Sequence, residues 1–332
     1  LAGEVKMIRI ITFLSTFLVF SFGSAYADPK KVGFIYIGPP GDHGWTYMHD
    51  VGRKYMESQL GDSITTTYLE NIPENADAVR AIRKLADSGH DLIFTTSFNY
   101  MDQTHEVAKD FPDIKFEHAT GYIQADNVAT YSARFYEGRM IEGHIAGHMT
   151  ETNTIGYIAS FPIPEVVRGI NAFYLAASKV NPDIKMKIIW VFTWYDPGKE
   201  ADAANTLINQ GADIIVQHTD TYAPCQAAQK AGVYAFGQAS NQEEFCPDAH
   251  LTSIEDIWGP YYAARAKAVV DGTWSSGDTW DGMDKGMVVM SPYNNKLMPA
   301  SLIQEAVNME VGIKDGTIHP FTGPIYNQAG EL

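Results

Sequence analysis

The sequence has 332 residues, which at roughly 150 residues per domain predicts about two domains. A composition of 45% hydrophobic and 19% charged residues is typical of a globular chain with a large buried core, and it excludes disorder over most of the length. The formal net charge of -16 provides no basic surface for a phosphate backbone, so we expect no nucleic-acid partner.

The first predicted element is a targeting segment over residues 1–27. Lys6 and Arg9 precede the apolar run Ile10–Phe22, and Ser24-Ala25-Tyr26-Ala27 ends in the small-x-small pattern that signal peptidase cleaves. A retained membrane anchor is the alternative, although the apolar run is shorter than the roughly 20 residues that a span requires. No cysteine lies at the cleavage site to accept a lipid. We therefore expect a periplasmic protein that is exported by a cleavable signal peptide and is not lipid-anchored.

After the leader, short β-branched runs alternate with amphipathic stretches. In chain order we expect strands at 31–37, 64–69, 91–96, 114–118 and 127–131, with helices at 46–60, 74–88 and 101–110. Strand and helix patterns at this spacing predict βαβ units and a mainly parallel sheet with helices on both faces.

The pattern then repeats in the second half of the chain. We expect strands at 154–159, 185–192, 212–217 and 233–237, with helices at 164–180, 198–209 and 223–230. The helix that begins at Asn75-Ala76-Asp77-Ala78 and the one that begins at Glu200-Ala201-Asp202-Ala203 lead into similar strands. A chance likeness is the alternative. The fold class that we expect is α/β, with two topologically similar lobes.

The loops after the predicted strands define the expected ligand site, because ligands of doubly wound sheets bind beyond the carboxyl ends of the strands. These loops contain Trp45, Trp194 and Trp258 but neither Arg nor Lys. Aromatic faces with a few hydrogen-bonding groups suit a flat, largely uncharged solute, whereas a phosphate or carboxylate would require a basic side chain. Ordinary packing is the alternative role of each tryptophan.

The sequence contains no motif that would indicate a cofactor or metal at this site. The loop Gly38–Gly44 has the spacing G-x-x-G-x-x-G, and its two prolines lack the N–H donors that a dinucleotide site uses. No Cys/His spacing resembles a zinc site, and neither HExxH nor GxSxG occurs. We therefore expect no cofactor, no metal and no catalytic residue. Cys225 and Cys246 either form a disulfide or stay unpaired thiols.

Several segments carry a resemblance to a known family. Gly41-Asp42-His43-Gly44-Trp45-Thr46 resembles the Asp-x-Ser/Gly-Phe-Asn segment of the basic membrane protein family of ABC-transporter substrate-binding proteins. Residues 106–116, 138–147, 163–168, 180–183 and 211–215 resemble that family in order and spacing. The resemblance implies a two-lobed, type I periplasmic-binding-protein fold with a hinge, whose lobes close on a solute. Known members bind purine nucleosides.

The resemblance also implies roles for single residues. The two stacking aromatics of the family fall on Trp45 and Trp194. Its base-binding aspartate falls on Asp42, and Thr46 replaces the neighbouring asparagine. A polar position after the third strand falls on Asn99.

Two departures from the family pattern concern the sugar contact. The family's Gly-x-Asp segment, whose carboxylate resembles a ribose-hydroxyl acceptor, is Gly237–Ser240 here, and a lysine that follows Thr-Ser is missing from Thr252–Asp256. These losses favour a free nucleobase or related heterocycle over a nucleoside. The alternative is that Gln238, Asp220 and Asp256 bind a sugar in a different arrangement.

For a fold of this type we expect lobe one to hold residues 28–127 and 253–290, and lobe two to hold residues 128–252 and 291–332. The expected crossings lie near Asn127, His250–Ser253 and Ser291.

The predicted function is that of a periplasmic solute-binding protein of an ABC importer. It would capture a purine-type nucleobase or related heterocycle between the lobes and, as a monomer, deliver it to the permease complex of the inner membrane. A purine nucleoside or sugar binding protein of the same fold is one alternative. Another is an exported nucleoside hydrolase that uses Asp42 with Asp220, or Asp220 with Asp256, as paired acids.

Overall fold

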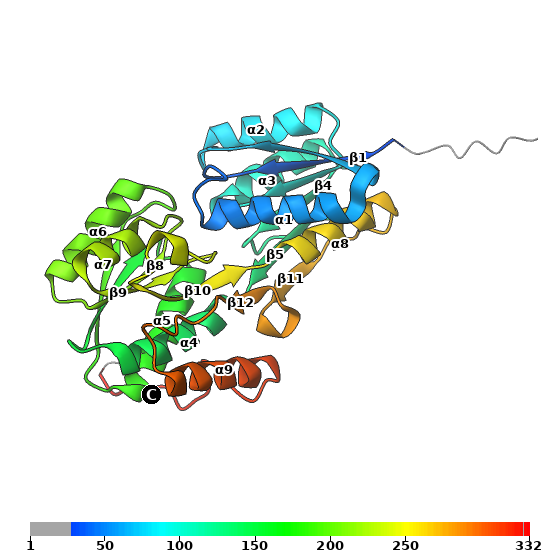
Figure 1. Ribbon diagram of the computed structural model, residues 1–332. Helices are drawn as coiled ribbons and strands as arrows, with labels where there is room; N and C mark the ends of the chain where they lie inside the picture. The colour runs from blue at the N-terminus through cyan, green and yellow to red at the C-terminus, as the bar shows by residue number, and fades with distance from the viewer. Residues whose placement is uncertain (1–27, 328) are drawn as a thin grey trace, which may run out of the picture.

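The structure, a computed structural model, describes residues 28–327 and 329–332, and the predicted targeting segment lies outside the described residues. The described chain forms two lobes, each built on a six-stranded sheet with helices on both faces (Figure 1). Among the helices of the described residues, none has the length and apolar character needed to cross a membrane.

The first lobe contains a parallel sheet in the order β11-β5-β4-β3-β1-β2. Its strands are β1 (Lys30–Ile35), β2 (Ile64–Leu69), β3 (Leu92–Thr95), β4 (Lys115–Ala119), β5 (Val128–Ala133) and β11 (Asp278–Asp281). Helices α1 (Trp45–Leu60) and α8 (Gly259–Val270) pack together on one face, and α2 (Ala76–Asp87) and α3 (Met101–Asp110) pack together on the other.

Successive side chains of β1 point alternately into the two hydrophobic cores of this lobe. Phe34 belongs to the hydrophobic core that includes Met56 of α1 and Tyr262 of α8. The next residue, Ile35, belongs to the core that includes Ile82 of α2. Successive side chains of a strand point to opposite faces of its sheet, so a continuous apolar run is what a sheet covered on both faces requires.

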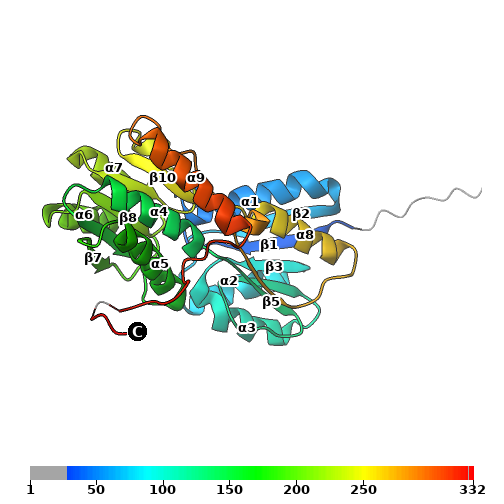
Figure 2. The same cartoon turned by 90° about the horizontal axis from the view of Figure 1, so that it is seen from below.

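The second lobe contains a sheet in the order β12-β10-β9-β8-β6-β7, in which β12 is antiparallel to β10. Its strands are β6 (Thr154–Ala159), β7 (Lys185–Trp190), β8 (Ile214–His218), β9 (Tyr234–Gly237), β10 (His250–Asp256) and β12 (Val288–Met290). Helices α4 (Tyr136–Met149) and α5 (Pro164–Val180) pack together, as do α6 (Pro197–Asn209) and α7 (Ala223–Ala231). The C-terminal helix α9 (Ala300–Lys314) packs against α4 (Figure 2).

The two sheets share one topology. The order β5-β4-β3-β1-β2 of the first sheet is repeated as β10-β9-β8-β6-β7 in the second. The prediction of two topologically similar α/β lobes is therefore confirmed. Each sheet is completed by a short strand from the C-terminal part of the chain, β11 in the first lobe and β12 in the second.

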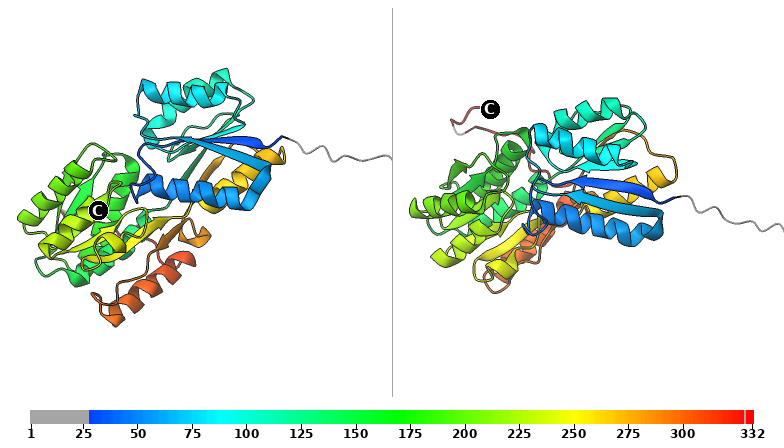
Figure 3. Two further views of the ribbon diagram at one scale, coloured as in Figure 1. Left: turned by 45° about the horizontal axis from the view of Figure 1, so that its top comes forward. Right: turned by 90° about the horizontal axis from the view of Figure 1, so that it is seen from above.

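Sheet membership differs from the predicted lobe boundaries. β5, which those boundaries give to lobe two, pairs with β4 in the first sheet. The end of β10 and all of β12, which they give to lobe one, pair with each other in the second sheet. The chain therefore changes lobe after β5, after β10 and before β12 (Figure 3). Strands β5 and β10 complete their pairing before the chain crosses, and β12 pairs after the last crossing.

A disulfide links helix α7 to a connection of the second lobe. Cys225 of α7 is bonded to Cys246, which directly follows a short 3-10 turn at Glu243–Phe245. Similar turns lie at Gly61–Ser63, Phe98–Tyr100 and Met283–Lys285. The disulfide decides between the two states that the sequence allows for these cysteines, and it ties α7 to the connection between β9 and β10.

Candidate ligand-binding cleft

A cavity lies between the lobes, beyond the carboxyl ends of the strands of both sheets. Its empty volume is about 330 Å³, and the residues that line it are Trp45, Ser97, Phe98, Thr120, Glu165, Trp194, His218, Asp220 and Gln238. The first four belong to lobe one and the others to lobe two. None of the lining residues is an arginine or lysine. This is the edge of the sheets at which doubly wound folds bind their ligands.

Trp45 contributes an aromatic wall from lobe one. It is the first residue of α1, and its indole Nε1 donates a hydrogen bond of 2.7 Å to the carbonyl oxygen of Thr96. Its ring lies edge-on to the rings of His49 and Trp258, at centroid distances of 4.4 and 5.5 Å. These contacts fix the orientation of the half-buried indole that lines the cavity.

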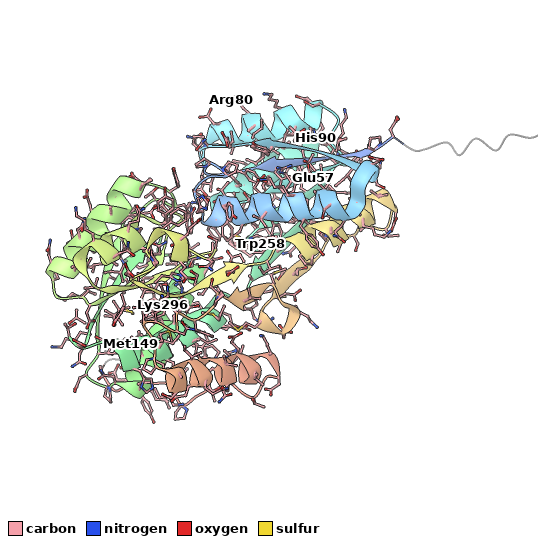
Figure 4. The ribbon with its side chains drawn as sticks, in the orientation of Figure 1. Glu57, Arg80, His90, Met149, Trp258 and Lys296 are labelled. Atoms are coloured by element: carbon pink, nitrogen blue, oxygen red, sulfur yellow. A yellow bond between two sulfur atoms is a disulfide. The ribbon has the colours of Figure 1, made fainter. Side chains whose placement is uncertain are left out.

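Trp258 itself does not line the cavity. Its side chain is completely buried, and Figure 4 labels it between the lobes, where β10 leads into α8. Its ring stacks on that of His49 at 5.0 Å. Trp258 therefore has the packing role that the sequence left open for each tryptophan.

Trp194 contributes an aromatic wall from lobe two. It follows β7, and its ring packs against Phe161 at a centroid distance of 5.2 Å. Its indole Nε1 is buried and has no hydrogen-bond partner among the described residues. Its carbonyl oxygen accepts a hydrogen bond of 2.9 Å from the backbone N–H of Asp220. The two lining residues are thus held in a fixed relation to each other.

Asp220 places a carboxyl group in the cavity. The side chain is only 5% exposed, and within the described chain its carboxyl makes no hydrogen bond. Burial, followed by the negative charges of Asp42 and Glu200, raises the pKa of the Asp220 carboxyl well above its usual range. The empty cavity therefore favours the neutral acid, and an ionised carboxylate requires a ligand group that donates a hydrogen bond to it.

His218 and Glu165 form a second polar group in the cavity. The Nε2 atom of His218 lies 3.4 Å from Oε1 of Glu165, and its Nδ1 is buried without a partner among the described residues. Burial lowers the pKa of His218 below its usual value. A neutral imidazole can donate from one nitrogen and accept at the other, so this pair can complement either kind of ligand group.

Gln238 is positioned by a buried arginine. Its side-chain oxygen accepts a hydrogen bond from Arg139, which also donates to Glu142 at 2.7 Å and to the carbonyl oxygen of Gln217 at 2.7 Å. The charge of Arg139 is therefore held behind the cavity. The amide nitrogen of Gln238 makes no hydrogen bond within the described chain, so it is available as a donor.

Four of the eight predicted site residues do not line the cavity, and Asp42 and Thr46 are the first two. The carboxylate of Asp42 accepts hydrogen bonds of 2.9 to 3.0 Å from the backbone N–H groups of Gly44, Thr46 and Tyr47, which leaves it occupied at the start of α1. The hydroxyl oxygen of Thr46 accepts a hydrogen bond of 3.2 Å from the backbone N–H of Gly38. Both residues hold the loop that presents Trp45.

Asn99 also acts behind the cavity. Its Nδ2 donates a hydrogen bond of 2.9 Å to Oε2 of Glu74, whose Oε1 accepts from the hydroxyl of Ser97. This arrangement orders the loop that contributes Ser97 and Phe98 to the cavity wall.

Asp256 lies at the end of β10 and is completely buried. Both of its carboxylate oxygens lack a hydrogen-bond partner among the described residues. Burial, followed by the charge of Glu165, raises its pKa well above the usual range, and the charge of Arg139 opposes this. Asp256 is therefore near the charged groups behind the cavity without being part of its wall.

The remaining lining residues are ones that sequence reasoning did not select. Ser97, Phe98, Thr120 and His218 lie in or next to the loops after strands that were expected to form the site, and their position was the only available signal. Glu165 lies in the first turn of α5, where an acidic residue ordinarily interacts with the helix dipole. No sequence pattern distinguishes it from such a residue.

A loop of lobe one touches lobe two and closes one side of the cleft. The carbonyl oxygen of His43 accepts a hydrogen bond from the hydroxyl of Ser240, and the His43 ring packs edge-on to Phe245 at 4.7 Å. A Cβ atom on Gly44 would lie 2.1 Å from the carbonyl oxygen of Asp220. The closed arrangement therefore requires glycine at position 44.

Comparisons with known proteins identify relatives of this chain. The Bmp family model, described as ABC transporter substrate-binding protein PnrA-like, matches residues 29–322. A purine-binding protein of Brucella abortus is 58% identical over 93% of this chain and 88% of its own. A putative ABC transporter glucose-binding protein of Haloferax volcanii is 36% identical over 88% of this chain and 74% of its own.

A solved structure supports the fold in the same way. The ABC transporter solute-binding protein from Aeropyrum pernix K1 superposes with a TM-score of 0.77, at 19% identity, over 88% of this chain and 93% of that protein. The two-lobed arrangement is thus that of known solute-binding proteins.

Proposed function

The chain belongs to the Bmp family of PnrA-like ABC transporter substrate-binding proteins, and from this premise we propose that it captures a purine-type nucleobase between its lobes and delivers it to the permease of an importer. Proteins of this class bind a small molecule, have a permease partner and are periplasmic or extracellular; the family consists of binding proteins and not of enzymes. A periplasmic location after cleavage of the leader, without a lipid anchor and as a monomer, is part of the proposal.

The observation that carries the proposal is the pair of indoles in one cavity whose lining contains neither arginine nor lysine. Trp45 comes from lobe one and Trp194 from lobe two. Closing the lobes on a planar ring would place one aromatic face on each side of it, an arrangement that favours stacking. The 58% identical relative named as a purine-binding protein supports the same class of ligand.

Unused hydrogen-bonding groups around the cavity suit the edge of a purine. In this proposal Asp220 accepts from a ring N–H or an exocyclic amine, and the amide nitrogen of Gln238 donates to a ring nitrogen or carbonyl oxygen. His218 complements either kind of group. Asp42, Thr46 and Asn99 act by holding the loops that carry the wall residues.

The closure of the cavity favours the base over its nucleoside, because the loop that contains His43 already packs against lobe two. Ser240, in the segment that replaces the family's sugar-contacting carboxylate, donates to the backbone of His43. A ribose would therefore find few free partners there.

A sugar is the second candidate, because the 36% identical relative is named as a putative glucose-binding protein. Indole faces also stack on sugar rings. A sugar, however, carries hydroxyl groups around its whole edge and requires many hydrogen-bonding partners, whereas Trp45, Phe98 and Trp194 make much of this cavity wall aromatic.

Mass spectrometry of the small molecules released on denaturing the purified protein tests the proposal. We expect a purine base among the molecules released from the protein as purified. If none is present, we expect adenine to be recovered after the protein has been incubated with adenine. After incubation with adenosine, unchanged adenosine or none at all should be recovered. Recovery of a hexose in its place would overturn the ligand class, and conversion of adenosine to adenine and ribose would overturn the assignment as a binding protein.

A further inference from the structure

A cluster of metal-ligating side chains lies at the contact of α4 and α9. His144 and His148 are one helical turn apart near the end of α4, so they share one face of the helix. Their ring centroids are 4.8 Å apart. Glu305, in the second turn of α9, reaches toward both rings from the neighbouring helix. Figure 4 labels Met149 at this end of α4, near the beginning of α9.

The three ligand atoms converge on one point. Oε2 of Glu305 lies 2.9 Å from Nε2 of His144 and 3.7 Å from Nε2 of His148. One ligand atom from each of the three residues lies within 4.8 Å of the others. Ligand atoms at about 2.0 to 2.2 Å from a tetrahedral zinc ion are spaced by roughly 3.4 Å. Small side-chain rotations therefore suffice to place all three atoms around one ion.

We propose that His144, His148 and Glu305 form a Zn²⁺ site that joins the C-terminal helix to α4. Two imidazoles and one carboxylate are a ligand set that suits Zn²⁺, whereas Ca²⁺ and Mg²⁺ prefer oxygen ligands. His144 is partly exposed, and His148 and Glu305 are exposed. A fourth position on the ion is thus open to water.

The site is independent of the solute site. None of its three residues lines the cavity between the lobes, so the proposal does not rest on the identity of the solute. Because the ion would be held by two helices, its binding would stabilise the packing of α9 on α4. The expectation of no metal came from spacing along the chain, and Glu305 is 161 positions from His144.

Hydrogen bonding alone is the competing explanation of the cluster. Glu305 already accepts from the imidazole of His144 at 2.9 Å, and such a pair needs neither a metal nor the second histidine. The two explanations differ in one consequence: only a metal site makes all three side chains necessary for binding an added ion.

Calorimetric titration of the tag-free, chelator-treated chain with Zn²⁺ alone tests the proposal. The variants are His144→Ala, His148→Ala and Glu305→Gln. His105→Ala is the matched control, because His105 is a partly exposed histidine of α3 whose Nε2 lies 3.0 Å from the carbonyl oxygen of Ile123. We expect one Zn²⁺ per chain in the wild type and the control, and binding at least about tenfold weaker in each of the three variants.

A second measurement distinguishes lost ligation from lost folding. At Zn²⁺ concentrations about 100-fold above Kd, the Tm of the wild type should rise by about 4 °C, and the three variants should keep their metal-free Tm within a degree while losing this rise. Equal Zn²⁺ affinity in the wild type and His144→Ala, or the absence of saturable binding at millimolar Zn²⁺, would overturn the proposal.

Discussion

The side chains that face the cavity have hydrogen-bonding groups that the protein itself leaves unused. The Trp194 indole N–H and Nδ1 of His218 are buried without partners among the described residues, and the carboxyl of Asp220 also lines the cavity. Unpaired buried polar groups are costly, so a ligand that supplies their partners gains affinity. By contrast, the carboxylate of Asp42 accepts hydrogen bonds from backbone N–H groups at the start of α1.

Truncation of either indole should weaken binding of adenine. Stacking is worth about 0.5 to 1.5 kcal/mol beyond the burial that is also lost, and about 1.4 kcal/mol is a factor of ten in affinity. Trp45→Ala and Trp194→Ala should therefore each raise Kd by about tenfold to a hundredfold in calorimetry.

The control for these variants is Phe192→Ala. Phe192 lies two residues before Trp194 on the same loop, is 63% exposed and does not line the cavity. Its truncation should leave Kd unchanged. An unchanged Kd in Trp45→Ala or Trp194→Ala would return that tryptophan to a packing role.

The buried carboxyl of Asp220 should make the ligand-free protein less stable as pH rises. In the unfolded chain this group ionises near its usual value of 3.8, whereas in the folded chain its pKa is well above that value. From pH 4 upward the unfolded state therefore loses a proton that the folded state retains, and the free energy of unfolding falls until the raised pKa is passed.

Asp220→Asn removes this effect and should flatten the fall of Tm between pH 5 and pH 8. Each unit of raised pKa is worth about 1.4 kcal/mol, or about 2 °C of Tm in a chain of this size. Thermal unfolding of the ligand-free wild type, Asp220→Asn and the exposed control Asp126→Asn measures it. A curve for Asp220→Asn that runs parallel to that of the wild type would contradict the explanation.

At the residue scale, position after a predicted strand was enough to select four residues that line the cavity. Trp45, Trp194, Asp220 and Gln238 follow predicted strands and line the cavity. Sequence reasoning did not anticipate the backbone contacts of Asp42. An aspartate before a helix can either accept backbone N–H groups or face a ligand, and the sequence is the same in both cases. Only the three backbone hydrogen bonds of Asp42 distinguish the two.

At the scale of elements, the loop Gly38–Gly44 connects solute binding to closure of the lobes. It presents Trp45 to the cavity and also contacts Ser240 and Phe245 of lobe two. At Gly44 the two backbones approach so closely that a Cβ atom would lie 2.1 Å from a carbonyl oxygen of Asp220. Any side chain at this position holds the lobes apart.

Gly44→Ala should therefore impair closure and raise Kd for adenine by at least about tenfold, a loss of about 1.4 kcal/mol or more. Gly41→Ala is the matched control in the same loop, because a Cβ atom there meets nothing within 4 Å. Small-angle scattering with adenine should report a larger radius of gyration for Gly44→Ala than for the control. Equal radii and equal affinities would show that this contact does not control closure.

Elements with clear boundaries were predicted from the sequence. Those that were not predicted lack a clear sequence signal for identifiable reasons. The predicted limits of β2, β6, α3 and α5 agree with the structure. Helix α4 was not predicted, since its glycines lower helix propensity. The packing explains them: a Cβ atom on Gly143 would lie 2.2 Å from the carbonyl oxygen of Phe173 in α5. Such close contact of two helices is visible only after folding.

At the scale of the whole molecule, the duplicated sheet topology was predictable, whereas the exact residues at which the chain crosses between lobes were not. The alternation of strands and helices fixes two similar lobes, because each βαβ unit is local in sequence. The last crossing lies between β11 and β12, strands of four and three residues that carry too few side chains to form a recognisable pattern. Their pairing partners lie far away in the sequence.

The central claim is that the closed cleft is built for a purine base. A nucleoside would bring ribose hydroxyls into the cavity, and each one left unpaired costs about 1 to 3 kcal/mol. A sugar carries hydroxyl groups around its whole edge, and the largely aromatic cavity wall would leave several of them without hydrogen-bonding partners.

Calorimetry with adenine, adenosine and glucose under identical conditions tests this claim most directly. We predict that adenine binds at least about tenfold tighter than adenosine, which corresponds to about 1.4 kcal/mol, and that glucose gives no saturable heat. Adenosine binding as tight as or tighter than adenine binding would contradict the preference for the base, and tight glucose binding would contradict the purine assignment itself.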